Sequence, residues 1–201
     1  MTIEVRHLGV REYDEVLAEM RAHTESRVPG EGDAIWLVEH PPVFTLGKAA
    51  ALAHVLAPGD IPVLRTDRGG QVTYHGPGQI VIYVMLDLPR RGLSVRSLVC
   101  GLEESVIRFL AEHGIEGQRR SGAPGVYVDG RKISALGLRI RRGCSYHGIA
   151  LNVDMDLDPF QLIDPCGYPS LEVTQLRDLG VTVAAAECGR RVAALCIETL
   201  L

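Results

Sequence analysis

Apolar residues recur at the spacing of an α-helix in three parts of the chain. A first helix is predicted over residues 11–26, and a last one runs from about Thr182 to the end. The clearest helical pattern lies between them, after Ser94, a residue type that caps helix N-termini, and it stops near Gly114. Its apolar positions are Val95, Leu98, Val99, Leu102, Val106, Phe109 and Leu110.

Apolar runs of strand length lie between the first two helices. Buried strands are predicted at Ala34–Glu39, which ends before two prolines, at Ile61–Arg65 and at Gln79–Leu88. The sequence Gly76-Pro77-Gly78 predicts a turn just before the last of these strands.

A hairpin region follows the long helix. Val126–Val128 leads into Asp129-Gly130, the dipeptide of a type I′ turn, and then into a strand over Arg131–Arg142. After a turn at Arg142-Gly143, apolar residues alternate from His147 to Val153 and predict a further strand. Asp158-Pro159 predicts a short helix, because proline suits the first helical position.

Long strands in hairpins together with separated helices predict an α+β domain. The expected arrangement is a two-layer one, in which a mixed, mostly antiparallel sheet packs against helices. The chain has 201 residues, without a linker-like run or an internal repeat. One domain over residues 1–201 is therefore expected.

Composition narrows the protein class. The 21 basic and 25 acidic residues give a net charge of −4, which argues against a general nucleic-acid binder. The apolar run Ile80–Leu86 is too short to span a bilayer, and no signal peptide is evident, so no membrane association is expected. Five cysteines without a C-x-x-C pair make structural zinc and a disulfide framework improbable, and a reduced, cytoplasmic protein is the expectation.

Cys166 stands apart from the other cysteines because Pro165 and Gly167 flank it and place it on a loop or tight turn. The backbone N–H groups of Cys166 and Gly167 could then point at an oxyanion. The competing interpretation is an ordinary turn with a half-buried thiol. The remaining cysteines fit packing roles: Cys100, Cys188 and Cys196 are expected in the core, and Cys144, after a hairpin turn, is a candidate for exposure.

A nucleophilic thiol needs a group that stabilises its thiolate, because a free cysteine has a pKa of about 8.5. Lys132 is a candidate, since it follows a tight turn and precedes small or apolar residues. The alternative is a solvated lysine on an edge strand. His75 and His147 are the other candidate bases, and a structural hydrogen-bonding role is equally compatible with each of them.

Two further features bear on ligands. Glycines in Arg68–Gln79 would allow close backbone approach to a ligand, although the segment contains no Walker A loop. Seven basic residues gather within 24 positions, which indicates either a solvated sheet face or a docking surface for an acidic macromolecule. They are Arg119, Arg120, Arg131, Lys132, Arg139, Arg141 and Arg142.

The order of three motifs resembles one family. RGGQVTYHGPGQ, then GRKISALGLRIRRGCSYHGIALNVDMD, then DPCG resembles the lipoyl(octanoyl) transferases of lipoate biosynthesis, as does EHPPVFTLGKAA. The resemblance runs from about Glu39 to Thr174. It implies the catalytic fold shared with lipoate–protein and biotin–protein ligases.

This resemblance also implies a reaction. Family members take an octanoyl group from octanoyl-acyl carrier protein, hold it as a cysteine thioester and pass it to a lysine of a lipoyl domain. Such acceptor domains occur in 2-oxoacid dehydrogenases and in the glycine cleavage H protein. No cofactor or metal is expected, and a monomer is the default.

By resemblance, Cys166 is the nucleophile, and Lys132 lowers its pKa and serves as acid and base. The implied acyl-pocket residues are Arg68, Gly69, Gly70, Gln71, Val72, Thr73, Tyr74, His75, Ala135, Leu136, Gly137, Gly148, Ile149 and Ala150. The sequence departs from the family pattern at 171–175, where Thr174 is kept but Gln175 stands in place of a serine. The alternatives are an ATP-dependent lipoate or biotin ligase and a non-catalytic binder of carrier domains.

Overall fold

A seven-stranded sheet forms the centre of the molecule. The computed structural model describes residues 3–28, 30–164 and 172–200. In spatial order the strands are β1 (Ile3–Val10), β2 (Asp33–Glu39), β6 (Gln79–Met85), β10 (Cys144–Asn152), β9 (Arg131–Arg141), β8 (Gly125–Val128) and β7 (Gln118–Arg119). The β1–β2 pair is parallel and the other pairs are antiparallel. The prediction of a mixed, mostly antiparallel sheet packed with helices is confirmed.

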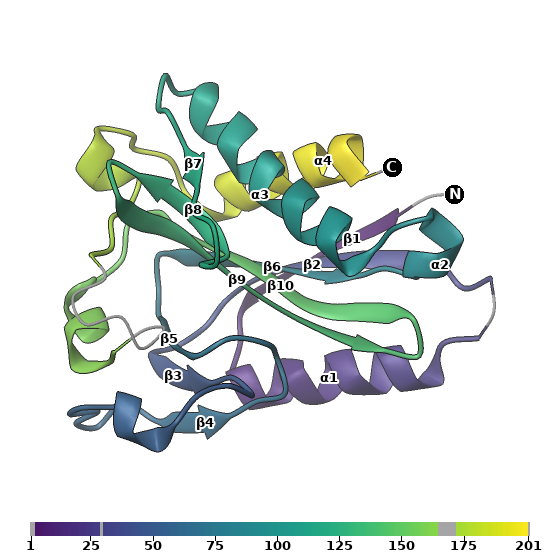
Figure 1. The fold of residues 1–201 in the computed structure, drawn as a ribbon, viewed down its shortest axis with the longest axis horizontal. Coiled ribbons are helices and arrows are strands. Elements are labelled where there is room, and N and C mark those ends of the chain that lie inside the picture. Colours follow the sequence, from purple (N-terminus) through teal and green to yellow (C-terminus); the bar gives the residue numbers. More distant parts are fainter. Residues whose placement is uncertain (1–2, 29, 165–171, 201) are drawn as a thin grey trace.

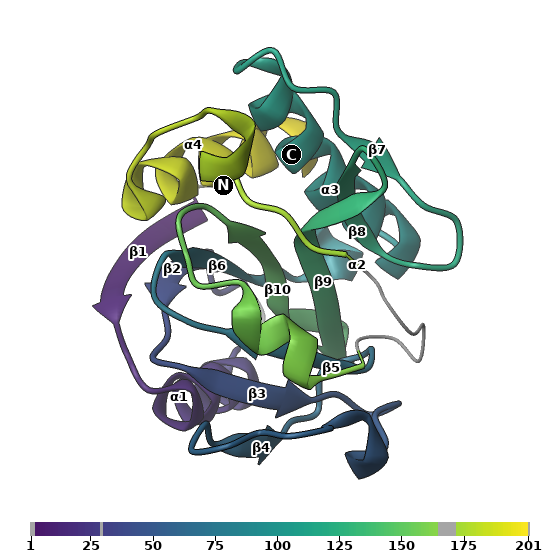
Figure 2. The ribbon, with the colours of Figure 1, turned by 90° about the vertical axis from the view of Figure 1, so that its left-hand side faces the viewer.

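Helices cover one face of this sheet, and a helix with a second sheet covers the other. Figures 1 and 2 show α3 (Val95–Ala111) and α4 (Ala185–Leu200) on one side, with α1 (Tyr13–Ser26) and a small sheet opposite. The small sheet has the order β4 (Val63–Arg65), β3 (Val43–Leu46) and β5 (Val72–His75). The short elements are α2 (Leu88–Arg91), η1 (Leu52–His54), η2 (Asp158–Leu162) and η4 (Arg177–Leu179).

Burial on both faces explains why the central strands are apolar throughout. In β2, Ile35 and Leu37 join the core under α3 and α4, whereas Trp36 and Val38 join the core against α1. The alternation follows from the two-residue period of a strand. The same alternation in β6 accounts for the continuous apolar run that the sequence shows. In the described part of the chain, no helix has both the length and the apolar character needed to cross a bilayer.

The predicted turns and caps have the expected chemistry. Ser94 accepts from the N–H of Ser97 while the Ser97 hydroxyl oxygen accepts from the N–H of Ser94, a reciprocal capping box at the start of α3. Asp129 and Gly130 have φ values of 49° and 78°, as a type I′ turn between β8 and β9 requires.

Four predictions about local structure need correction. The strand predicted to reach Leu88 ends at Met85, because the Asp87 carboxylate accepts from the N–H of Arg90 and caps α2. The last helix begins at Ala185 rather than near Thr182. Cys100 is exposed, since it lies about 200° around α3 from Leu98. Cys144 is buried, because it begins β10 and forms a β-bridge with Asp87.

Candidate active site

A cavity of about 520 Å³ brings together segments that are far apart in the sequence. Its walls come from the glycine-rich segment before and within β5, from β9 and from β10. Lys132 lines this cavity, and so do thirteen of the fourteen residues predicted for the acyl pocket. They are Arg68, Gly69, Gly70, Gln71, Val72, Thr73, His75, Ala135, Leu136, Gly137, Gly148, Ile149 and Ala150.

One residue predicted for the site, Tyr74, is placed differently. Tyr74 does not line the cavity, because its ring packs into the core of the small sheet. Its ring lies 5.5 Å from the rings of both Phe44 and Phe160, measured between centroids. Cys166 lies outside the described residues, so its role as the nucleophile stays a prediction.

Lys132 lines the cavity and is buried, with 8% of its surface exposed. Its Nζ donates to the carbonyl oxygen of Pro124 at 3.3 Å and lies 5.2 Å from the centre of the Tyr127 ring. This position excludes the solvated edge-strand lysine that the sequence left open. Its amine therefore lies in the cavity wall, next to the face of the Tyr127 ring.

The chain just after residue 171 is paired with β9 at Lys132. The N–H of Lys132 donates to Glu172 O at 2.8 Å, and the N–H of Thr174 donates to Lys132 O at 3.0 Å. On the other side of 165–171, the N–H of Asp164 donates to His54 O at 2.8 Å. Val173, between the two paired residues, lines the cavity.

Two glycines of the cavity wall are required by close backbone approach. A Cβ on Gly148 would lie 1.9 Å from Ile82 O in β6. A Cβ on Gly137 would lie 2.9 Å from Gly69 O, where the glycine-rich segment crosses β9. Larger side chains at these positions would push the walls of the cavity apart.

Arg68 is buried and organises the neighbouring small sheet. Its Nη2 donates to Thr45 O at 2.6 Å and to Thr45 Oγ1 at 2.8 Å, and its Nη1 donates to Gly69 O at 3.0 Å. These bonds hold the glycine-rich segment against β3. The guanidinium therefore fixes the cavity wall as well as bordering it.

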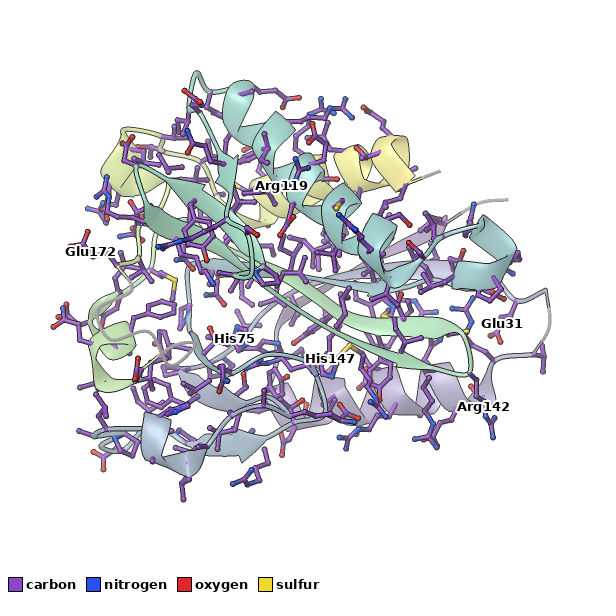
Figure 3. The ribbon with its side chains drawn as sticks, in the orientation of Figure 1. Glu31, His75, Arg119, Arg142, His147 and Glu172 are labelled. Atoms are coloured by element: carbon purple, nitrogen blue, oxygen red, sulfur yellow. The ribbon has the colours of Figure 1, made fainter. Side chains whose placement is uncertain are left out.

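The two predicted histidines come from facing layers: His75 ends β5 of the small sheet, and His147 belongs to β10 of the larger sheet (Figure 3). Burial lowers the pKa of His75 to about 3, so its ring is neutral near neutral pH. Burial also lowers the pKa of His147, although its Nε2 lies 2.9 Å from Asp67 Oδ1. Both rings line the cavity as neutral hydrogen-bonding groups, which favours the structural interpretation over that of a primary base.

Sequence reasoning missed several residues that support this cavity. Tyr83 lines it and hydrogen-bonds through its hydroxyl to Nε2 of His40 at 2.8 Å. Asp67 accepts from the hydroxyl of Tyr146 at 2.7 Å. The hydrogen bonds from His147 and Tyr146 hold the pKa of Asp67 far below its usual range, although burial alone would raise it. In the sequence, the only indication that Asp67 supports the cavity is its position directly before the glycine-rich motif.

The basic cluster is divided between the two ends of β9. Arg131 and Arg141 are ten residues apart on this strand, which corresponds to about 33 Å. Arg119 forms ion pairs with Glu103 and Glu104, and Arg141 forms one with Glu25. A single continuous basic surface is therefore the wrong description.

The side chain of Gln175, where the sequence departs from the family pattern, forms its hydrogen bonds away from the cavity lining. Its Oε1 accepts from the N–H of Met155 at 2.6 Å, and its Nε2 donates to Asp178 at 3.2 Å. Gln175 is not among the residues that line the cavity.

Comparison with known proteins agrees with this architecture. The Lipoyl protein ligase A/B catalytic domain family matches residues 12–195. A protein of Alkalilimnicola ehrlichii named octanoyltransferase is 57% identical over 199 residues, which cover 99% of this chain and 93% of that protein. A Pseudomonas putida octanoyltransferase is also 57% identical, over 93% of this chain and 87% of its own length.

Solved structures show the same fold at low identity. The crystal structure of lipoate–protein ligase A bound with ATP has a TM-score of 0.82 at 20% identity, covering 100% of this chain and 86% of that one. The biotin protein ligase of Aquifex aeolicus has a TM-score of 0.59 at 18% identity, covering 100% and 69%. The family match and the two close relatives show that this chain belongs to the octanoyltransferases of the lipoyl protein ligase A/B catalytic-domain family.

Proposed function

We propose that this chain transfers an octanoyl group from octanoyl-acyl carrier protein to a lysine of a lipoyl domain, through a thioester on Cys166. The observation that supports this proposal best is the acyl-sized cavity with the buried Lys132 in its wall. The neighbouring chain, Glu172–Thr174, pairs with Lys132 shortly after Cys166 in the sequence. The apolar cavity suits a hydrocarbon chain, and the amine suits thiol activation.

In the first step, the Cys166 thiolate attacks the carbonyl carbon of the carrier thioester. A carbon–sulfur bond to Cys166 forms, the bond to the carrier sulfur breaks, and the carrier thiol leaves with a proton. The Lys132 ammonium would stabilise the attacking thiolate and could supply that proton.

In the second step, the amine of the acceptor lysine attacks the enzyme thioester. An amide bond forms, the thiolate of Cys166 leaves, and the neutral amine of Lys132 takes the proton that the new amide nitrogen loses. Conversion of a thioester into an amide is favourable, so the cycle needs no ATP.

The proposed partners are octanoyl-acyl carrier protein as donor and the lipoyl domains of 2-oxoacid dehydrogenases and of the glycine cleavage H protein as acceptors. A monomeric, cytoplasmic enzyme acting as one catalytic domain is the simplest form of this proposal. One alternative to this function is an ATP-dependent ligase that uses free octanoate, because the fold is similar to that of lipoate–protein ligase A.

One assay separates the two functions. The protein is incubated with an apo lipoyl domain and either octanoyl-acyl carrier protein without ATP, or octanoate with ATP and magnesium. The proposal expects modification of the lipoyl domain by the first donor alone. Modification that depends on octanoate and ATP would establish the ligase instead.

Lys132→Ala is expected to slow alkylation of Cys166 by iodoacetamide at pH 7 by about tenfold or more, because loss of a nearby ammonium raises the pKa of a thiol. The chain has two lysines, and Lys48, exposed and outside the cavity lining, gives the matched control Lys48→Ala. Lys132→Arg separates the two roles, since arginine keeps the charge but cannot act as a base. Equal alkylation rates in wild type and Lys132→Ala would contradict the role of Lys132.

Acyl-carrier docking is expected to depend on the basic end of β9 that lies next to Lys132. Arg131→Glu is expected to raise the KM for octanoyl-acyl carrier protein about fivefold at low salt, because an acidic carrier would meet a reversed charge. Arg141→Glu, at the far end of the same strand, is the matched control and is expected to change KM little. Equal effects of the two reversals would contradict docking at the Lys132 end.

A further inference from the structure

A buried chain of side-chain hydrogen bonds connects the cavity wall to the segment that pairs with Lys132. Asn152 Nδ2 donates to Thr174 O at 2.9 Å, and Gln79 Nε2 donates to Asn152 Oδ1 at 2.9 Å. Gln79 Oε1 lies 2.6 Å from His75 Nδ1. Gln79 and Asn152 face each other across the β6–β10 ladder, and both are buried.

The chain has only one consistent direction. A carbonyl oxygen can only accept, so the amide of Asn152 must turn its NH₂ toward Thr174 and its oxygen toward Gln79. Gln79 must then donate through Nε2, which leaves its oxygen to accept the proton on Nδ1 of His75. Because His75 is neutral, its Nε2 carries a lone pair and lies 3.5 Å from the hydroxyl oxygen of Thr45.

Two residues of this hydrogen-bonded chain belong to the cavity wall. His75 and Asn152 line it directly, and Thr174 pairs with Lys132 through the backbone. Thr45, at the other end, accepts from Arg68. The two amides therefore lock the His75 wall and residues 172–174 into one geometry.

We propose that Gln79 and Asn152 are positioning residues for acyl transfer: their amides fix the tautomer of His75 and hold residues 172–174 in place against Lys132. This inference rests on the proposed function for its kinetic test. The hydrogen-bonded chain itself has a separate, direct test.

Asn152→Asp breaks one link while keeping the shape of the side chain. The introduced carboxylate still accepts from Gln79, but it cannot donate to Thr174 O. At pH 8 we expect kcat for octanoyl transfer to fall about tenfold, with KM changed less than about threefold. Burial raises the pKa of the introduced carboxyl, so it should protonate as the pH falls and donate to Thr174 again.

The ratio of variant to wild-type kcat is therefore expected to rise from pH 8 to pH 6. Taking this ratio removes the pH dependence that both proteins share. Gln175→Glu is the matched control, since it also turns an amide into a carboxyl, next to Thr174 but outside the hydrogen-bonded chain. A ratio near one throughout, or a low ratio that does not change with pH, would overturn the proposal.

The ¹⁵N shifts of the His75 ring in the wild-type protein give a test that needs no folded variant. A protonated Nδ1 with an unprotonated Nε2 is expected, whereas the opposite tautomer would overturn the hydrogen-bonded chain. If the wild-type protein transfers no octanoyl group, the proposed function fails, and the ring shifts still decide whether the chain exists.

Discussion

Replacing Cys166 by serine is expected to reduce octanoyl transfer by about a thousandfold or more. Serine keeps the size and position of the nucleophile, but its hydroxyl is a much weaker nucleophile at neutral pH than a thiolate. Lys132 can stabilise a thiolate electrostatically, whereas it gains nothing from an alcohol that stays protonated. The measurement is the initial rate of lipoyl-domain modification by octanoyl-acyl carrier protein.

Cys100→Ser is the matched control for this loss. Cys100 is exposed on α3 and does not line the cavity, so full activity is expected in that variant. Full transfer activity in Cys166→Ser would exclude the covalent mechanism and would leave direct attack by the acceptor amine on the carrier thioester.

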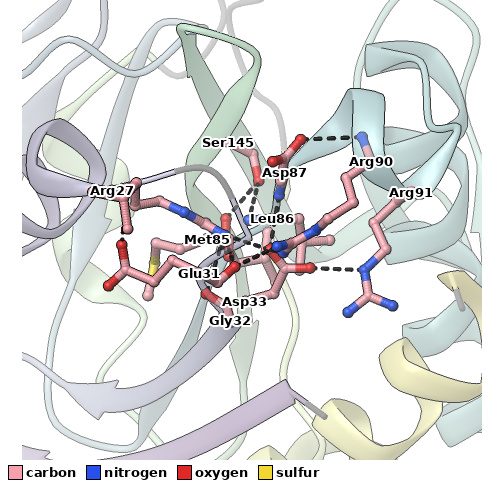
Figure 4. Close-up of polar contacts among 12 residues, drawn as sticks. Arg27, Glu31, Gly32, Asp33, Met85, Leu86, Asp87, Arg90, Arg91 and Ser145 are labelled. Atoms are coloured by element: carbon pink, nitrogen blue, oxygen red, sulfur yellow. Dashed lines mark hydrogen bonds and ion pairs between the residues drawn. The ribbon is translucent and has the colours of Figure 1, made fainter. Parts of the chain in front are cut away.

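Replacing Asp33 by asparagine is expected to lower the free energy of unfolding by about 3–5 kcal/mol. The Asp33 side chain is fully buried at the start of β2, where three guanidinium groups converge on it (Figure 4). Its Oδ1 accepts from Arg27 and Arg90 at 2.6 Å each, and its Oδ2 accepts from Arg91 at 2.7 Å. Neutral asparagine would leave these charges buried without their counter-ion.

This carboxylate joins elements that are distant in sequence. Arg27 follows α1, Arg90 and Arg91 belong to α2, and the N–H of Asp87 donates to Asp33 Oδ1 at 2.9 Å. The loss is therefore expected to appear as cooperative unfolding at lower urea concentration. Glu4→Gln, which breaks the exposed Arg6–Glu4 pair, is the control and is expected to cost less than about 1 kcal/mol.

The role of Asp33 also predicts the direction in which stability changes with pH. Burial would raise the pKa of Asp33, but the hydrogen bonds from Arg27, Arg91 and the Asp87 N–H outweigh it, and the pKa is lowered. The stabilisation is thus complete above the unfolded pKa of about 3.9 and is lost as the pH falls through the folded value. In Asp33→Asn, the free energy of unfolding is expected to fall less steeply as the pH is lowered. The same steepness as in the wild type would contradict the role of Asp33.

Local patterns in the sequence predicted some of the elements around the site and missed others. The type I′ dipeptide Asp129-Gly130 placed the β8–β9 hairpin, and Ser94 placed the start of α3. Strands β3 and β5 were missed because Pro41, Pro42 and the glycines of the Arg68–Gln79 segment read as breaks. They are held by pairing with each other, which is a long-range property of the fold.

The supporting residues of the site could not be predicted from local sequence. Asp33 has little local signal, because only Arg27 is near it in the sequence and its partners Arg90 and Arg91 lie more than fifty residues away. Gln79 and Asn152 likewise meet only through the pairing of β6 with β10. A motif can place Lys132 on a strand, but its burial depends on Pro124, Tyr127 and the chain after residue 171.

Intact-mass spectrometry tests most directly whether Cys166 carries the octanoyl group as a thioester. The protein is incubated with octanoyl-acyl carrier protein in the absence of an acceptor and measured before and after treatment with hydroxylamine. A gain of one octanoyl group is expected, which hydroxylamine removes, which peptide mapping places on Cys166, and which an apo lipoyl domain discharges. An unmodified mass under conditions in which the same preparation modifies a lipoyl domain would contradict the thioester on Cys166.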